Sequence, residues 1–150
     1  MSPELSAQGR ITGYASLYNV TDHDGDQVVP GAFEASLQEW KVAGRFVPML
    51  WQHDISRPIG IWTHFKSDAR GLLATGRLLL DDVQQAKEAH ALAKAGAISG
   101  LSIGYRAVEA SRGQGARLLL RIKLYEVSLV TFPAQEGARV SAVKKFPVRL

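Results

Sequence analysis

The spacing of apolar and polar residues predicts a β-rich protein. Runs rich in Ile, Leu, Val and Tyr are separated by short segments of Asp, Gly, Pro and Ser, which favour turns. The strands expected from this pattern cover residues 10–19, 46–53, 59–66, 71–80, 98–108 and 117–132, with a last one near 139–144.

Two segments have helical rather than strand spacing. Phe33, Leu37 and Trp40 recur at helical intervals, and Pro30 is placed for the first turn of that helix. A second helix is expected over 82–94, because acidic residues open it and Gly96 follows it. Together these elements predict an α+β fold built on a closed or strongly curved β-barrel of six to seven strands with two or more flanking helices.

Length and composition narrow the class of protein. The chain has 150 residues, which suits one domain over 1–150, and we expect residues 1–9 and about 145–150 to be flexible ends. It has no cysteine, which excludes a disulfide-stapled scaffold, a cysteine-ligated metal and a cysteine nucleophile. The net charge of +4, with a basic tail, is only a weak hint of nucleic-acid binding. No apolar run approaches the ~20 residues that cross a bilayer, so no membrane contact is expected.

Ser102 is the first candidate for chemistry. Successive side chains of a strand point to opposite faces, so Ser102 shares its face with Gly100 and Gly104 while Leu101 and Ile103 form the core face. Glycine in a strand often marks the close approach of a ligand or another backbone, and cleared space beside a hydroxyl suits attack on a peptide carbonyl. The alternative is a bulge or a bend with an incidental serine.

His53 is the candidate base among the histidines. It ends a predicted strand, where Met49 and Trp51 are its neighbours on the same face. Partial desolvation there disfavours the charged imidazole and keeps a neutral base available, although a structural histidine is the alternative. His23 and His90 are expected in a loop and on a helix surface.

Glu126 is the candidate partner of that base. Strand parity places it on the apolar face of the last long strand, in line with Leu124. An ionised carboxylate there costs several kcal/mol unless it is paired, and the ring N–H of His53 is a natural donor. The alternatives are a bulge that turns the carboxylate to solvent, or an ion pair with Arg121 or Arg106.

An aspartate-rich segment precedes the first helix. Asp22, Asp24 and Asp26 alternate as in a calcium loop, but the glycine comes two places too early. Phe33 also stands where such a loop has a bidentate glutamate. The segment is therefore interpreted as a shaped turn, and no metal or other cofactor is expected.

Six short motifs follow one another along most of the chain, from about residue 13 to residue 143. They are G-Y-A-S-L-Y-N (13–19), D-x-x-G-D-x-V-x-P-G-A-F (22–33), H-D with P-I-G (53–54 and 58–60), D-x-x-G-L (68–72), G-L-S-I-G-Y (100–105) and E-V-S-L-V-T-x-P-A (126–134). In this order and spacing, they resemble the prohead (capsid maturation) proteases of tailed bacteriophages, a serine peptidase family related to the herpesvirus assemblins.

The resemblance implies a mostly antiparallel fold like that of the herpesvirus proteases. It also implies catalysis by Ser102 as nucleophile and His53 as general base, with Glu126 as the third residue. Assemblins use a second histidine in the third place, so His64 is the alternative. We favour Glu126, because His64 lies beside Trp62 in a strand where a satisfied or half-exposed histidine is expected.

The function implied by the resemblance is that of a serine endopeptidase in phage or phage-like procapsid maturation. Its expected substrates are the scaffold segment of the major capsid protein and the protease itself, cleaved through an acyl-enzyme on Ser102 with His53 as base. The expected setting is the interior of assembling procapsids in the cytoplasm of the bacterial host. Self-association is left open, and neither a membrane nor a nucleic acid is an expected partner.

Two other functions are compatible with the residues alone. One is a metal-dependent hydrolase using His53, Asp54, His64 and the aspartate-rich segment. The other is a non-enzymatic capsid-assembly or nucleic-acid-binding β-protein that uses the positive charge. For the oxyanion of the serine mechanism, the candidates are Arg106 and the loop 132–134.

Overall fold

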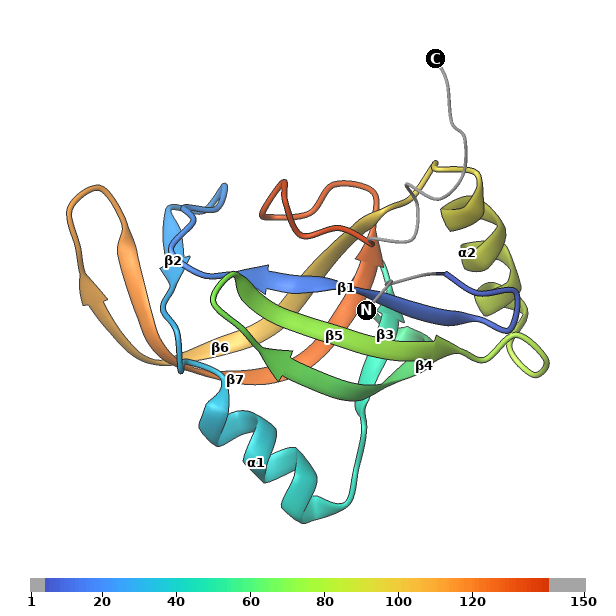
Figure 1. Cartoon of the computed structure of the whole chain (residues 1–150), viewed down its shortest axis with the longest axis horizontal. Coiled ribbons are helices and arrows are strands. Elements are labelled where there is room, and N and C mark those ends of the chain that lie inside the picture. The colour runs from blue at the N-terminus through green and yellow to red at the C-terminus, as the bar shows by residue number, and fades with distance from the viewer. Residues whose placement is uncertain (1–4, 141–150) are drawn as a thin grey trace.

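The computed structural model describes residues 5–140 and contains seven strands and two helices in that range (Figure 1). In chain order they are β1 (Arg10–Leu17), β2 (Asp26–Val28), α1 (Glu34–Ala43), β3 (Val47–Trp51), β4 (Asp54–Ser67), β5 (Gly71–Leu78), α2 (Gln84–Lys94), β6 (Gly100–Arg112) and β7 (Arg117–Val130). Every long predicted strand and both predicted helices are present, with ends shifted by a few residues.

The strands form one sheet in the order β1-β5-β4-β3-β7-β2, and β6 pairs with β7. All pairings are antiparallel except those of β2 and β3 with β7. Near the end of the described chain, Val140 bridges to Gly13 of β1 and Arg139 bridges to Gly100 of β6. This short segment therefore links the two edges of the curled sheet. The predicted strongly curved, mostly antiparallel sheet of six to seven strands with two helices is confirmed.

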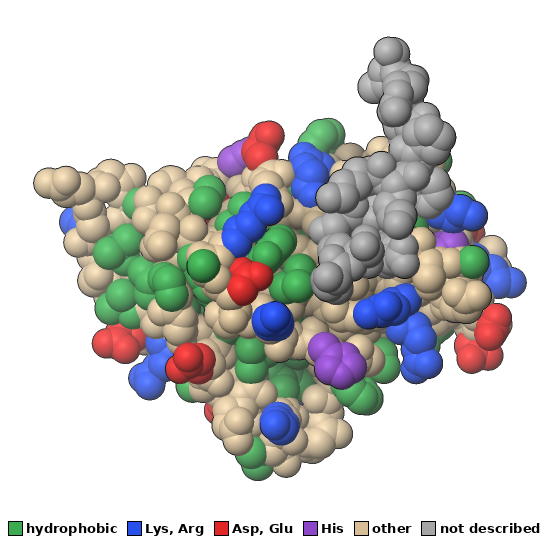
Figure 2. Space-filling model, viewed as in Figure 1, with side chains coloured by type: hydrophobic (Ala, Val, Ile, Leu, Met, Phe, Trp, Pro, Cys, Tyr) green, Lys and Arg blue, Asp and Glu red, His purple; other side chains and the backbone are tan. Residues whose placement is uncertain are grey.

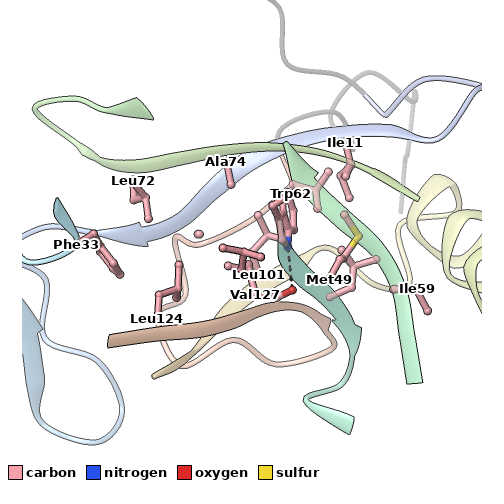
Figure 3. Packing of buried hydrophobic residues seen from close by; sticks show 14 of the residues in the cluster. Ile11, Phe33, Met49, Ile59, Trp62, Leu72, Ala74, Leu101, Leu124 and Val127 are labelled. Atoms are coloured by element: carbon pink, nitrogen blue, oxygen red, sulfur yellow. Dashed lines mark hydrogen bonds between the residues drawn. The ribbon is translucent and has the colours of Figure 1, made fainter. Parts of the chain in front are cut away.

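The core fills the inside of the curled sheet (Figure 3). Leu72 and Ala74 of β5 belong to the same buried cluster as Leu101 of β6 and Val127 of β7. Trp62 lies among them, 1% exposed, and its indole N–H donates to the backbone oxygen of Val127 over 3.0 Å. Burial of this many large apolar side chains fixes the positions of β6 and β7, the two strands that carry residues of the site described below.

Helix α1 is anchored on β7. The hydroxyl of Ser36 accepts the backbone N–H of Leu124 (2.8 Å), and the indole of Trp40 donates to the backbone oxygen of the same residue (2.9 Å). The helix begins after Phe33, so Pro30 lies in the turn that precedes it. The prediction that Pro30 stands in the first helical turn was wrong, because residues 30–33 first make a separate turn.

Helix α2 packs against the sheet through its alanines and through His90. The predicted place of His90 on the helix surface was wrong: the residue is 9% exposed and its Nε2 donates to the backbone oxygen of Ser6 (2.8 Å). Residues 5–9 were expected to belong to a flexible end. In the structure Leu5 belongs to the core cluster and the oxygen of Gly9 accepts the N–H of Leu78, whereas Ala7 and Gln8 are exposed.

The last predicted strand and the basic tail fall mostly beyond the described chain. Residues 139 and 140 form isolated bridges, whereas 141–144 and the expected flexible end at 145–150 lie outside the described residues.

On the face in Figure 2, positive and negative side chains are interspersed. Neither described helix has the length and hydropathy that a membrane span requires.

Candidate active site

His53 lies in a tight turn between β3 and β4. Trp51 pairs with Asp54, which leaves Gln52 and His53 as a two-residue hairpin loop. Both have positive φ, 52° and 62°, as a type I′ turn requires. The prediction that His53 continues the face of Met49 and Trp51 was therefore wrong, since the turn removes the residue from the alternation of the strand.

This turn is tied to the end of β7. The backbone N–H of Gln52 donates to the oxygen of Leu129 (2.9 Å), and the N–H of His53 donates to Oγ of Ser128 (3.0 Å). The side-chain amide of Gln52 also donates to Oγ1 of Thr131 (2.8 Å) and accepts its N–H (3.1 Å). These bonds offset the unfavourable left-handed backbone of two non-glycine residues.

A β-bulge in β7 sets the direction of Glu126. Gly104 pairs with Glu126 while Tyr105 pairs with Leu124, so Tyr125 is the extra residue. Consecutive residues of β6 face opposite sides, and the bulge therefore places Glu126 opposite to the core face of Leu124. The prediction that Glu126 shares that apolar face was wrong. A bulge was one of the alternatives, but the carboxylate does not turn to solvent, because Glu126 is 7% exposed.

Two donors satisfy the buried carboxylate. Nδ1 of His53 lies 2.5 Å from Oε2, and the hydroxyl of Ser128 donates to Oε1 over 2.6 Å. The hydrogen bond to Glu126 raises the pKa of His53, and burial of the imidazole opposes this rise. With Nδ1–H committed to the carboxylate, Nε2 is the ring atom free to take a proton.

Ser102 lies on β6 directly opposite Ser128 of β7. It is 8% exposed and lines the same cavity of about 180 Å³ as His53. The hydrogen bonds of residues 5–140 include none between Oγ of Ser102 and the His53 ring. Contacts between nucleophile and base are often looser without substrate. The structure thus brings His53 and Glu126 into direct contact and places Ser102 at the same cavity.

The two glycines beside Ser102 make room for groups of the protein itself. A Cβ on Gly104 would overlap the carboxylate of Glu126, and a Cβ on Gly100 would lie 2.7 Å from Cδ of Pro133. The expectation of cleared space on both sides of the serine was wrong. The glycines permit close approach, as their presence in a strand suggested, but the approaching groups are Glu126 and Pro133.

The other candidate residues lie elsewhere. His64 is exposed, its Nδ1 is 3.0 Å from Oγ1 of Thr63, and it lines a different cavity. Asp54 bonds to Ser56 and Arg57. Within residues 5–140, no three His, Cys, Asp or Glu side chains are grouped so that they could hold a metal ion.

The aspartate-rich segment is a turn, as predicted. Oδ1 of Asp22 accepts the N–H groups of Asp24 (2.8 Å) and Asp26 (3.0 Å), which is the pattern of an Asx-turn. Asp26 begins the short strand β2 and forms a two-pronged ion pair with Arg117, at 2.8 and 3.0 Å. The hydrogen bonds from Arg117 hold the pKa of Asp26 below its usual value. Asp22, Asp24 and Tyr105 line the cavity that Ser102 also lines.

The two oxyanion candidates differ in position. Ala134, from the loop 132–134, lines the cavity together with Gln135. Arg106 does not line it; its Nε donates to the hydroxyl of Tyr125 over 3.4 Å. The arrangement therefore favours the backbone of the loop over the arginine side chain.

Sequence reasoning overlooked Ser128 and Gln52. Ser128 stands two residues after Glu126, and period-two alternation alone would have placed both on one face. The role of Gln52 depends on contacts with Thr131, 79 positions away, and no local pattern signals it.

Comparisons with known proteins show which family this chain matches. Residues 1–147 match the family described as caudovirus prohead serine protease. The prohead protease of Enterobacteria phage HK97 is 35% identical in an alignment of 142 positions that covers 91% of this chain and 61% of that protein. The capsid polyprotein of Pseudomonas phage PAJU2 is 33% identical in an alignment of 141 positions that covers 89% of this chain and 20% of the relative. The chain thus spans less than two thirds of either relative.

Solved structures show the same fold. The capsid assembly protease of bacteriophage T4 superposes with a TM-score of 0.67 at 16% identity, over 81% of both chains. The KSHV protease, solved with a hexapeptide phosphonate inhibitor, superposes with a TM-score of 0.62 at 14% identity, over 89% of this chain and 64% of its own. On the family match and the HK97 relative together, this chain belongs to the caudovirus prohead serine protease family.

Proposed function

We propose that this protein is a serine endopeptidase with Ser102 as nucleophile, His53 as general base and Glu126 as the residue that orients the base. The observation that carries the proposal is the bond between Nδ1 of His53 and the buried Glu126, at a cavity that Ser102 also lines. A nucleophile, a base and a group that orients the base are the parts of a catalytic triad.

The first half of the reaction is acylation. Oγ of Ser102 attacks the carbonyl carbon of the scissile peptide, and its proton passes to Nε2 of His53. The negative charge of Glu126 stabilises the imidazolium, and the bond at Nδ1 fixes the ring. When the tetrahedral intermediate collapses, the C–N bond breaks, the leaving amine takes the proton from Nε2, and an ester remains on Ser102.

Water completes the reaction in the second half. His53 takes a proton from the water that attacks the ester, and then returns it to Oγ of Ser102 as the product acid leaves. In both halves the carbonyl oxygen carries negative charge in the intermediate. The backbone N–H of Ala134, in the loop 132–134, is the donor that we assign to it, because Ala134 lines the cavity and Pro133 has no N–H to offer.

The proposed substrates follow from the relatives. One relative is named a prohead protease and another a capsid polyprotein. We assign to this chain cleavage of the scaffold segment of the major capsid protein, and of itself, inside procapsids that assemble in the cytoplasm of the bacterial host. The names of these two relatives support capsid proteins as the substrate class.

Co-expression with the capsid protein encoded by the same genome tests this function. The wild-type protease should shorten the capsid protein at one site, and Ser102→Ala should abolish this because loss of the nucleophile costs roughly 10⁴–10⁶ in kcat. Ser111→Ala, on the exposed part of the same strand, is the matched control and should cleave normally. Normal cleavage by Ser102→Ala would contradict the proposal.

A further inference from the structure

One buried hydroxyl contacts both partners of the His53–Glu126 pair. Ser128 is 0% exposed and lies on β7, two residues after Glu126. Its Oγ is 2.6 Å from Oε1 of Glu126 and 3.0 Å from the backbone nitrogen of His53. Chemistry fixes the direction of both bonds, because a backbone N–H can only donate and a carboxylate can only accept. The hydroxyl therefore receives the N–H of His53 and donates its own proton to Glu126.

We infer that Ser128 is a positioning residue, whose hydroxyl fixes the Glu126 carboxylate and the His53 turn in one geometry. The inference rests on the proposed function, since it assigns Ser128 a part in the same reaction. Ser128 does not line the cavity and touches no reacting atom. It acts through its two neighbours.

The carboxylate is the first reason that this hydroxyl matters. One carboxylate oxygen of Glu126 bonds to the imidazole and the other bonds to Ser128, so the two bonds together fix the orientation of the carboxylate. Without the hydroxyl, Oε1 becomes a buried charged acceptor with no donor, which is costly. The carboxylate keeps its bond to Nδ1 of His53, but it is no longer held in one orientation, so the imidazole that it orients is held less precisely.

The turn is the second reason. His53 has a φ of 62°, which a non-glycine residue adopts at a cost, and its N–H has Ser128 as its partner. Gln52 anchors the preceding residue to Leu129 and Thr131. Ser128 thus holds the backbone of His53 to β7, in addition to the bond that Glu126 makes with the imidazole.

Removal of the hydroxyl has an effect that loss of packing does not share. A donor on Oε1 stabilises the Glu126 charge most when His53 is neutral, because an imidazolium would itself offset that charge. Ser128→Ala therefore makes protonation of the pair easier and moves the acidic limb of the rate profile to higher pH. The other charged groups near His53 are the same in the variant and in the wild-type protein. Asp22 and Asp24 line the cavity, and Asp54 keeps its bonds to Ser56 and Arg57.

The test uses the rate at which a fluorophosphonate labels Ser102, measured from pH 5 to pH 9, which requires no knowledge of the natural cleavage site. Ser128→Ala should label about ten- to a hundredfold more slowly, the cost of losing one hydrogen bond to a charged group. Its acidic midpoint should move upward, and Ser128→Thr, which restores a hydroxyl, should recover both the rate and the midpoint. If the alanine variant does not fold, Ser128→Cys, a weak donor of similar size, takes its place.

Ser36→Ala is the matched control. Ser36 is also a buried serine that accepts a backbone N–H, but it lies in α1 and bonds to Leu124. It should lose stability without a change in the labelling midpoint. An unchanged midpoint and rate in Ser128→Ala, or equal losses in Ser128→Ala and Ser36→Ala, would overturn the inference. Failure of the wild-type protein to label at Ser102 would instead refute the proposed function.

Discussion

Nδ1 of His53 lies 2.5 Å from Oε2 of Glu126, although the two residues are 73 positions apart in the chain. Each is carried by an irregularity in an otherwise regular sheet. His53 stands in a two-residue turn, and Glu126 follows the bulge at Tyr125. Parallel pairing of β3 with the end of β7 brings the two irregularities together. The candidate site therefore lies where the β-sheet departs from the regular alternation of side chains between its two faces.

The pH dependence of activity should reflect this contact. Glu126 raises the pKa of His53 above its usual 6.5, and the reaction needs the neutral ring. We expect kcat/KM to rise with pH through a midpoint above 6.5 in the wild-type protein. Glu126→Gln should lower that midpoint and reduce kcat about a hundredfold to ten-thousandfold. A histidine NMR titration checks the same shift directly, and equal midpoints in both proteins would contradict it.

The same pKa shift predicts how stability changes with pH. A histidine whose folded pKa is raised contributes stability that is fully present below the unfolded value of 6.5 and is lost as pH rises through the folded pKa. The advantage of the wild-type protein over Glu126→Gln in free energy of unfolding should therefore shrink as pH rises from about 6 to about 9. Urea titrations across this range measure it. An advantage that grows with pH would refute the contact.

Gly104→Ala should impair the site while leaving the sheet intact. The added methyl group would occupy the place of the Glu126 carboxylate, and displacement by about 1 Å can cost on the order of a hundredfold in rate. Because Gly104→Ala and Glu126→Gln act on the same carboxylate, their losses should not add in the double variant. Circular dichroism checks the fold. Additive losses would show that Gly104 matters for another reason.

Asp26→Asn should destabilise the protein and leave the His53–Glu126 pair unchanged. The substitution removes the ion pair between the buried Asp26 and the half-exposed Arg117, and because solvent screens the arginine we expect a loss of only about 1 kcal/mol. The folded pKa of Asp26 is lowered, so this stability is present above 3.8 and is lost as pH falls through the folded pKa. Thermal unfolding at pH 7 and pH 3 measures the difference from the wild-type protein, which should be smaller at pH 3. Asp81→Asn, at an exposed aspartate, is the control and should match the wild-type protein.

Periodicity was sufficient for the curled sheet, its six long strands and both helices, because each has a clear pattern of apolar residues, but it missed the short strand β2 in the segment predicted as a turn. It placed Ser102 on the strand face opposite to Leu101 and Ile103, since the pairing of β6 is regular around that position. It assigned His53 and Glu126 to the wrong strand faces, because a turn and a bulge each break the period-two alternation on which that assignment depended. Neither irregularity has an Asn-Gly or glycine signal: the turn is Gln52–His53 and the bulge residue is Tyr125. Their geometry depends on bonds to residues far away in the sequence, such as Thr131.

The central claim is that Ser102 is a nucleophile activated by His53. Peptide mapping by mass spectrometry after treatment with a fluorophosphonate tests it most directly. We predict one phosphonyl adduct on Ser102 in the wild-type protein, and its loss in His53→Ala while that variant remains folded. An adduct on another serine, or labelling of Ser102 that is as fast in His53→Ala as in the wild-type protein, would contradict the claim.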